Sequence, residues 1–170
     1  MIGNIVRNLV SPIIDSVIPT SGELVRNGDF SQPLSTDDWI PASGTVQSIV
    51  DGRLKIENGD GGYKRSSQGI TVDTGATYRL VVDAIDDSQS GNAAEAKVYI
   101  GLSAGTRANL NTQSLTLSTP QTPIWDYTFV PSVDVGTTGD TDVIYIVLIC
   151  HVNAVGAWTT YDNVSLKKVS

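Results

Sequence analysis

Four acidic side chains are the candidates for acid–base chemistry, because two carboxyl groups at a suitable distance can hydrolyse a glycosidic bond. They are Asp73, Asp83, Glu95 and Asp126, and nothing in their spacing selects a pair. His151 is the single histidine, which excludes a zinc site built from several histidines and leaves a catalytic triad one candidate base. The sequence contains no Gly-x-Ser-x-Gly motif to provide a serine nucleophile. We therefore expect a protein that is not an enzyme.

Aromatic and amide side chains indicate binding instead. A sugar ring packs its apolar face on a flat aromatic ring, while amides and carboxylates hydrogen-bond its hydroxyl groups. Tyr63, in the glycine-rich loop 58–63, is the best candidate for an exposed ring. Trp125 and Tyr127 flank an aspartate on a predicted strand, and we expect one of these two rings to face away from the core. The candidate glycan-binding residues are Tyr63, Trp125, Tyr127, Asn58, Asp60 and Gln68.

Charge and loop composition argue against two other kinds of ligand. With 18 acidic and 11 basic residues, the net charge of -7 would repel nucleic-acid phosphates, so we expect no nucleic-acid partner. The loop 86–92 lacks the alternating aspartates and the closing glutamate of a calcium-binding loop, so it is predicted to be a solvated loop. No Gly-x-x-x-x-Gly-Lys motif is present to hold a phosphate.

The chain of 170 residues is long enough for one well-formed core, and one all-β domain with an appendage is the simplest organisation. The single cysteine, Cys150, lies in the apolar run 143–150 and is predicted to be buried and inert. No apolar run approaches the roughly 18 residues of a membrane span, so we expect a soluble protein. Polar residues and a proline interrupt the first 19 residues, which argues against a cleavable secretion signal.

From residue 45 onward, apolar residues recur with the period of two that is typical of strands. Residues 45–50 and 53–57 flank Asp51-Gly52, which predicts a hairpin. The segment 141–151 is apolar on both faces, which predicts a central strand covered on two sides. The remaining predicted strands are 68–73, 76–85, 96–102, 114–117, 124–130 and 158–167. Eight or nine short strands separated by turns favour an all-β sandwich or jelly roll.

Residues 1–22 differ from the rest and are predicted to be an anchoring or oligomerisation segment and its linker, preceding a sandwich over residues 23–170. Apolar residues recur there at steps of three and four, along one helical stripe that Pro12 should kink. Such a short helix needs a surface to pack on. It either folds back on its own sandwich or docks on another protein or on sister subunits. The stripe consists of Ile2, Ile5, Val6, Leu9, Val10, Ile13, Ile14 and Val17.

Several short pieces of residues 23–168 resemble, in their order, the carbohydrate-binding modules of the family 4/9 type. The pieces are Asn27-Gly28-Asp29-Phe30, Trp39, Val50 to Leu54, Gln68 to Val72, Gly75 to Tyr78, Trp125 to Val130 and Tyr161 to Leu166. The resemblance implies a jelly-roll, galactose-binding-like β-sandwich, a fold common in glycan-degrading enzymes and in bacteriophage virion proteins.

The resemblance also implies roles for residues near the two ends of the sandwich. Such modules often hold a structural calcium there, and the candidate ligands are Asp29 and Asp162 with the main-chain carbonyls of residues 26–28. Trp39 and Trp158 adjoin these ends and are expected in the core. In the terminal strand, Asp162 is expected to share a face with Val164 and Leu166.

Two functions agree with this pattern. The first is a non-enzymatic structural protein of a phage-like virion, such as a fibre, spike or decoration subunit. Its segment 1–19 would dock on the particle or on sister subunits in a homo-oligomer such as a trimer, and its sandwich would project and contact host surface glycan. Such a protein is assembled in the host cytoplasm and resides in the virion. The second is a free-standing or excised polysaccharide-binding module that acts outside the cell. An uncharacterised hydrolase is the least favoured alternative.

Overall fold

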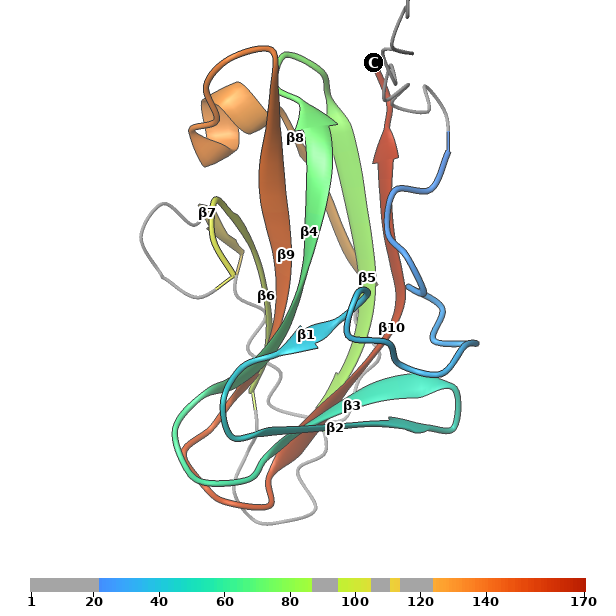
Figure 1. Ribbon diagram of the computed structural model, residues 1–170, viewed down its shortest axis with the longest axis vertical. Coiled ribbons are helices and arrows are strands. Elements are labelled where there is room, and N and C mark those ends of the chain that lie inside the picture. The colour runs from blue at the N-terminus through green and yellow to red at the C-terminus, as the bar shows by residue number, and fades with distance from the viewer. Residues whose placement is uncertain (1–21, 87–94, 105–110, 114–123) are drawn as a thin grey trace, which may run out of the picture.

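The computed structural model describes residues 22–86, 95–104, 111–113 and 124–170. They form two five-stranded antiparallel sheets that pack face to face (Figure 1). The first sheet contains, in spatial order, β1 (Ile40–Pro41), β4 (Lys64–Asp73), β9 (Thr141–His151), β6 (Glu95–Gly101) and β7 (Asn111–Gln113). The second contains β2 (Thr45–Val50), β3 (Arg53–Asn58), β10 (Trp158–Lys168), β5 (Tyr78–Asp86) and β8 (Ile124–Phe129). This arrangement confirms the predicted all-β sandwich.

The hairpin of β2 and β3 forms where the sequence predicts it. Asp51 and Gly52 have φ angles of 51° and 73°, the left-handed conformation that a two-residue hairpin turn requires at both central positions. The register pairs Val50 with Arg53 across this turn. The Asp-Gly dipeptide therefore fixes which residues of β3 face the core.

β9 is the central strand of the first sheet and extends over the predicted residues 141–151. Its inward side chains, from Ile144 to Cys150 in steps of two, are fully buried, as predicted for the cysteine. On the outward side Val147 and Ile149 are also buried, whereas Val143 is 40% exposed. The prediction of a strand covered on both sides thus holds for the second half of β9 only.

Residues 23–39 cross from one sheet to the other, as the blue trace beside β10 shows in Figure 1. Near the start, the Leu24 N–H donates to the Leu166 carbonyl at 3.0 Å. At the end, β1 pairs with β4 of the first sheet. Phe30 and Trp39 are buried, and their rings lie 5.9 Å apart, so this segment closes one side of the core. Leu24 and Val25 do not form a strand, since only an isolated bridge at Glu23 occurs there.

Two expectations for β10 are wrong. A β-bulge between Asp162 and Ser165 changes the register with β5, and Asn163 has a φ of 49°. The extra residue places Val164 in the core while Asp162 is only partly buried, so these two side chains do not share one face. Trp158 is also outside the core: it is half-buried, and the Lys55 ammonium group lies 5.1 Å from its ring centroid.

Pro131 follows β8 and begins a five-residue π-helix at Pro131–Val135. The described helical residues include no segment long and apolar enough to cross a membrane. The predicted strand 114–117, the apolar segment of residues 1–19 and most of the loop 86–92 lie outside the described residues.

Candidate functional site

The outward side of the first sheet is the side turned away from the core, and alternate residues of β4, β9 and β6 form it. Antiparallel register places them in rows: Arg65 pairs with Ile149, which pairs with Lys97, and Ser67, Val147 and Tyr99 form the next row. We call this surface the outer face. It consists of Arg65, Ser67, Gly69 and Thr71 of β4, Val143, Tyr145, Val147, Ile149 and His151 of β9, Glu95, Lys97 and Tyr99 of β6, and Tyr63 just before β4.

An apolar cluster, separate from the main core, lies at the centre of the outer face. It is formed by Tyr99, Val147 and Ile149, with the half-buried Tyr145 packed against it. Gly69 is the cross-strand partner of Tyr145, and a β-carbon at Gly69 would lie 3.1 Å from the Tyr145 ring. The glycine therefore leaves room for the ring to lie close to the sheet, which presents an aromatic surface there.

A second aromatic surface lies at one end of the outer face. Tyr63 stacks on His151 with ring centroids 3.8 Å apart and an interplanar angle of 15°. Tyr63 remains 44% exposed, so part of its side chain faces solvent. The loop before it is fixed by Asn58, whose amide donates to the carbonyls of Gly62 and Val152 at 2.8 and 2.9 Å.

Glu95 links the charged groups at this end. Its carboxylate accepts from the Lys97 ammonium group at 2.8 Å and lies 3.0 Å from Nδ1 of His151. The hydrogen bond from Lys97, with a smaller contribution from His151, lowers the pKa of Glu95. Glu95 is therefore an ionised hydrogen-bond acceptor at neutral pH and a poor general acid.

The predicted glycan-binding residues are not all available to a ligand. Tyr63 lies on the outer face, and Asp60 is exposed in the loop before it, where it forms an ion pair with Lys64. Asn58 and Gln68 are fully buried, and main-chain groups of the protein already occupy their amides. The prediction that these two amides contact a sugar is therefore wrong. Their hydrogen-bond partners include main-chain carbonyls from segments distant in the sequence, which the sequence alone does not show.

Trp125 and Tyr127 both face the interior side of β8. Trp125 is buried, and Tyr127 is half-buried against the core, with the two rings 6.1 Å apart. The expectation that one ring faces outward is wrong because residues two positions apart on a strand share a face. Asp126, between them, takes the outward position and pairs with Arg79.

The structure brings together residues that sequence analysis did not select for binding, namely Tyr145, Tyr99, Arg65 and His151, the last of which it considered only as a catalytic base. They come from three strands and become neighbours only through the register of β4, β9 and β6. The alternation within each strand gave a partial signal, because Tyr145 lies in phase with Val143 and Val147. Which strands would pair could not be read from that alternation.

The predicted calcium ligands do not form a suitable cage. The carboxylate of Asp29 accepts from the main chain and hydroxyl of Ser31, and Asp162 pairs with Arg53. Each of the three neighbouring carbonyls already accepts a hydrogen bond within the protein: Arg26 O from Gln68, Asn27 O from Trp39 and Gly28 O from Val164. Within the described ranges no group of three or more His, Cys, Asp or Glu side chains could hold a metal ion. The residues present therefore do not fit a calcium that needs six to eight oxygens.

The four carboxylates considered for glycoside hydrolysis serve other partners. Asp73 pairs with Lys168, Asp126 pairs with Arg79, and Asp83 accepts from the Asn163 amide. The pKa of Asp73 is lowered by the Gly75 N–H and then by Lys168, and the pKa of Asp126 is lowered by Arg79. A general acid needs a raised pKa, so these shifts disfavour catalysis by either group.

Neither a family model nor a curated protein matches the sequence, whereas solved structures match the fold. A CBM4 module is 20% identical with a TM-score of 0.60, covering 85% of this chain and 99% of its own. The CBM22-1 xylan-binding domain of Paenibacillus barcinonensis Xyn10C is 11% identical with a TM-score of 0.56, covering 89% and 97%. The enzymatically active domain of bacteriophage CBA120 tailspike protein 4 is 11% identical with a TM-score of 0.55, covering 86% and 21%. Fischerella cyclases share the fold as well. The chain is therefore a β-sandwich of the type found in carbohydrate-binding modules, a fold that also occurs in enzymes.

Proposed function

We propose that this protein is a non-catalytic glycan-binding domain and that the outer face of the first sheet is its binding surface. The observation that carries the proposal is the exposed Tyr63 ring, stacked on His151 at one end of a sheet surface that also presents Tyr145. Flat aromatic rings beside charged and hydroxyl side chains are the combination that sugar rings require. Glu95 and Lys97 supply charged groups on the same surface.

The structural neighbours support this choice, since a CBM4 module and a xylan-binding CBM22 domain share the fold over nearly their whole length. The carboxylates support the non-catalytic part of the proposal. Those considered for hydrolysis are held by basic or amide side chains, and the pKa values that depart from the ordinary range are lowered.

The test is a titration of the full chain against soluble polysaccharides, followed by calorimetry with the tightest binder. We expect saturable binding that Tyr63→Ala weakens several-fold, up to about tenfold, since stacking on an aromatic ring contributes about 0.5–1.5 kcal/mol. Trp158→Ala is the matched control, because Trp158 is an aromatic residue of the second sheet that packs under Lys55. An equal loss in both variants would place the binding surface elsewhere, and hydrolysis that accompanies binding would contradict the non-catalytic assignment.

We further propose that the domain belongs to a phage-like virion, as a fibre, spike or decoration subunit, with residues 1–19 docking on the particle or on sister subunits. The apolar stripe from Ile2 to Val17 supports this role, and so does the shared fold with part of a bacteriophage tailspike protein. In this proposal the protein is a homo-oligomer located in the virion, and its sandwich contacts host surface glycan. The alternative is a free-standing polysaccharide-binding module outside the cell.

Light scattering distinguishes the two proposals. The full chain should have the mass of a trimer or another oligomer, and the double substitution Leu9→Asp and Ile13→Asp should convert it to a monomer, because charges on the stripe prevent apolar packing. A control pair on the opposite helical face, Asn4→Asp and Asn8→Asp, should leave the mass unchanged. A full chain that is monomeric at all concentrations would favour the free-standing module.

A further inference from the structure

Arg65 is a positive charge on the outer face that no carboxylate of the described residues neutralises. Every other lysine and arginine of these residues, except Lys167, forms an ion pair. Nε of Arg65 is also buried without a hydrogen-bond partner. Nε itself is closed to a ligand, whereas the two terminal nitrogens of Arg65 are not buried and form no hydrogen bond or ion pair with the described residues. These two nitrogens are therefore the place where an external acceptor would be stabilised.

The position of Arg65 places this charge among the residues that would hold a sugar. Its main chain is fixed beside the end of β1, where the carbonyl accepts from Ala42 N–H at 3.0 Å and from the Thr45 hydroxyl at 3.2 Å. Its side chain lies on the outer face next to its cross-strand partner Ile149. The next row of outward side chains on this face contains the stacked rings of Tyr63 and His151. A ligand on the Tyr63 ring would therefore have Arg65 beside it.

The other charges of this end balance one another. Glu95 is the carboxylate that β4, β9 and β6 present near Arg65, and it is already bonded to Lys97 and His151. Asp60, in the loop before Tyr63, is likewise paired with Lys64. Among the described residues this end of the outer face therefore carries one positive charge without a counterpart, that of Arg65, although the whole chain has a net charge of -7. Such a local reversal of sign favours an anionic ligand.

We propose that the glycan bound at the outer face is acidic, with the carboxylate of a uronic acid unit pairing with Arg65 while a sugar ring stacks on Tyr63. This proposal rests on the glycan-binding function argued above and specifies its ligand class. A carboxylate offers two oxygens that match the fork of a guanidinium group, whereas a neutral hydroxyl offers a single weaker acceptor. Arg65 is then the residue that selects carboxylated over neutral polymers.

The test compares matched polymers that differ in charge alone: polygalacturonate with its fully methyl-esterified form, and glucuronoxylan with its carboxyl-reduced form. The full chain should bind the carboxylated member of at least one pair about tenfold or more tightly, as expected for a charge-assisted contact. Arg65→Gln should bring the two members of that pair to equal affinity, and Arg65→Lys should keep part of the preference.

Lys167→Gln is the matched control, because Lys167 is the other described cation without an ion pair and belongs to β10 of the second sheet. It should leave the preference unchanged. Equal binding of both members by the unmodified chain, or an equal loss for both members in Arg65→Gln, would overturn the acidic ligand while leaving the glycan-binding function in place. Absence of binding to every polymer, neutral ones included, would overturn both. Thermal unfolding of each variant verifies that the sandwich is intact.

Discussion

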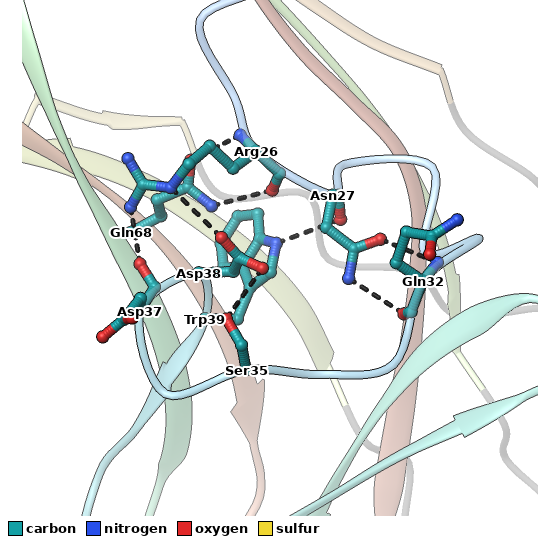
Figure 2. Close-up of polar contacts among 8 residues, drawn as sticks. All are labelled: Arg26, Asn27, Gln32, Ser35, Asp37, Asp38, Trp39 and Gln68. Carbon is teal, nitrogen blue, oxygen red and sulfur yellow. Dashed lines mark hydrogen bonds and ion pairs between the residues drawn. The ribbon is translucent and has the colours of Figure 1, made fainter.

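The side-chain amide of Gln68 forms hydrogen bonds with both main-chain groups of Arg26, accepting from its N–H at 2.7 Å and donating to its carbonyl at 2.9 Å (Figure 2). The side chain of this β4 residue thus makes the two hydrogen bonds that a neighbouring strand would otherwise make with the main chain of Arg26, 42 positions earlier in the sequence. Because Gln68 is fully buried, it holds the crossing segment 23–39 against the first sheet where no strand pairing does so.

We predict that Gln68→Leu lowers the free energy of unfolding by about 3 kcal/mol, because it leaves a main-chain donor and acceptor of Arg26 without partners. Arg26→Ala is the control: it keeps the main chain and removes only an exposed side chain that pairs with Asp38, so it should cost less than about 1 kcal/mol. Urea unfolding followed by tryptophan fluorescence measures both values. Equal losses would show that the glutamine holds the segment no more strongly than the Arg26 side chain does.

Asn58 fixes the loop that leads to Tyr63, since it also accepts from Gly61 N–H at 2.8 Å. We predict that Asn58→Ala lowers the free energy of unfolding by about 2–3 kcal/mol, because three main-chain groups lose their partner. It should also weaken glycan binding, since Tyr63 would no longer be held against His151. The exposed Asn153 provides the control substitution, Asn153→Ala, which should change neither quantity. If Asn58→Ala is destabilised but binds glycan with normal affinity, the loop that leads to Tyr63 is not part of the binding site.

The sequence was informative where local pattern determines structure. The turn Asp51-Gly52 requires positive φ angles that few residue pairs adopt, and the run 141–151 has no polar face to expose, so both features were predicted with their bounds. Asn58 and Gln68 were misassigned because the residues next to an asparagine or glutamine do not show whether its amide is buried or binds a sugar. What distinguishes them is a main-chain partner far away, such as Val152, which lies 94 residues from Asn58.

The outer face illustrates the same limit. Arg65, Tyr145 and Lys97 are unremarkable within their own strands, and only the strand order β4-β9-β6 makes them one surface. We expected Trp158 in the core because large apolar side chains are usually buried there. Instead, its ring on β10 lies outside the core, beneath the Lys55 ammonium group. The pairing of strands in the folded protein, which depends on all strands together, determines where these side chains lie.

Tyr161 connects the two sheets through its hydroxyl group. From β10 of the second sheet, the hydroxyl donates to the Ile149 carbonyl at 2.6 Å and accepts from the Ile149 and Lys97 N–H groups at 3.1 and 3.2 Å. We predict that Tyr161→Phe lowers the free energy of unfolding at pH 7 by about 2–3 kcal/mol, because these main-chain groups lose a partner in the interior. Tyr127→Phe, at a half-buried ring of β8, should change it by less than about 0.5 kcal/mol. Similar losses in both variants would contradict a special role for Tyr161.

The same tyrosine predicts how stability depends on alkaline pH. Burial raises the pKa of Tyr161 well above its ordinary value of 10.0, so the folded chain keeps a proton that the unfolded chain loses. The unfolded state then binds fewer protons above pH 10, and stability falls as the pH rises, by up to about 1.4 kcal/mol per pH unit for this group. Tyr78, whose pKa burial also raises, contributes in the same direction. Urea unfolding between pH 9 and 11 should show a smaller decline for Tyr161→Phe than for the unmodified chain, and parallel declines would refute the assignment.

Gly69 tests whether the Tyr145 ring is part of the binding surface. Alanine at this position would place a β-carbon 3.1 Å from the ring, so the ring must tilt away from the sheet. We predict that Gly69→Ala changes stability by less than about 1 kcal/mol, since a flexible side chain on the outer face absorbs the contact, and that it weakens glycan binding several-fold. Gly75→Ala is the control, because its β-carbon would approach only the Asp73 carboxylate, at 3.8 Å, at the far end of β4. Calorimetric titration of both variants gives the comparison. Unchanged affinity in a folded Gly69→Ala would restrict the binding surface to the end of the outer face that Tyr63 and Arg65 occupy.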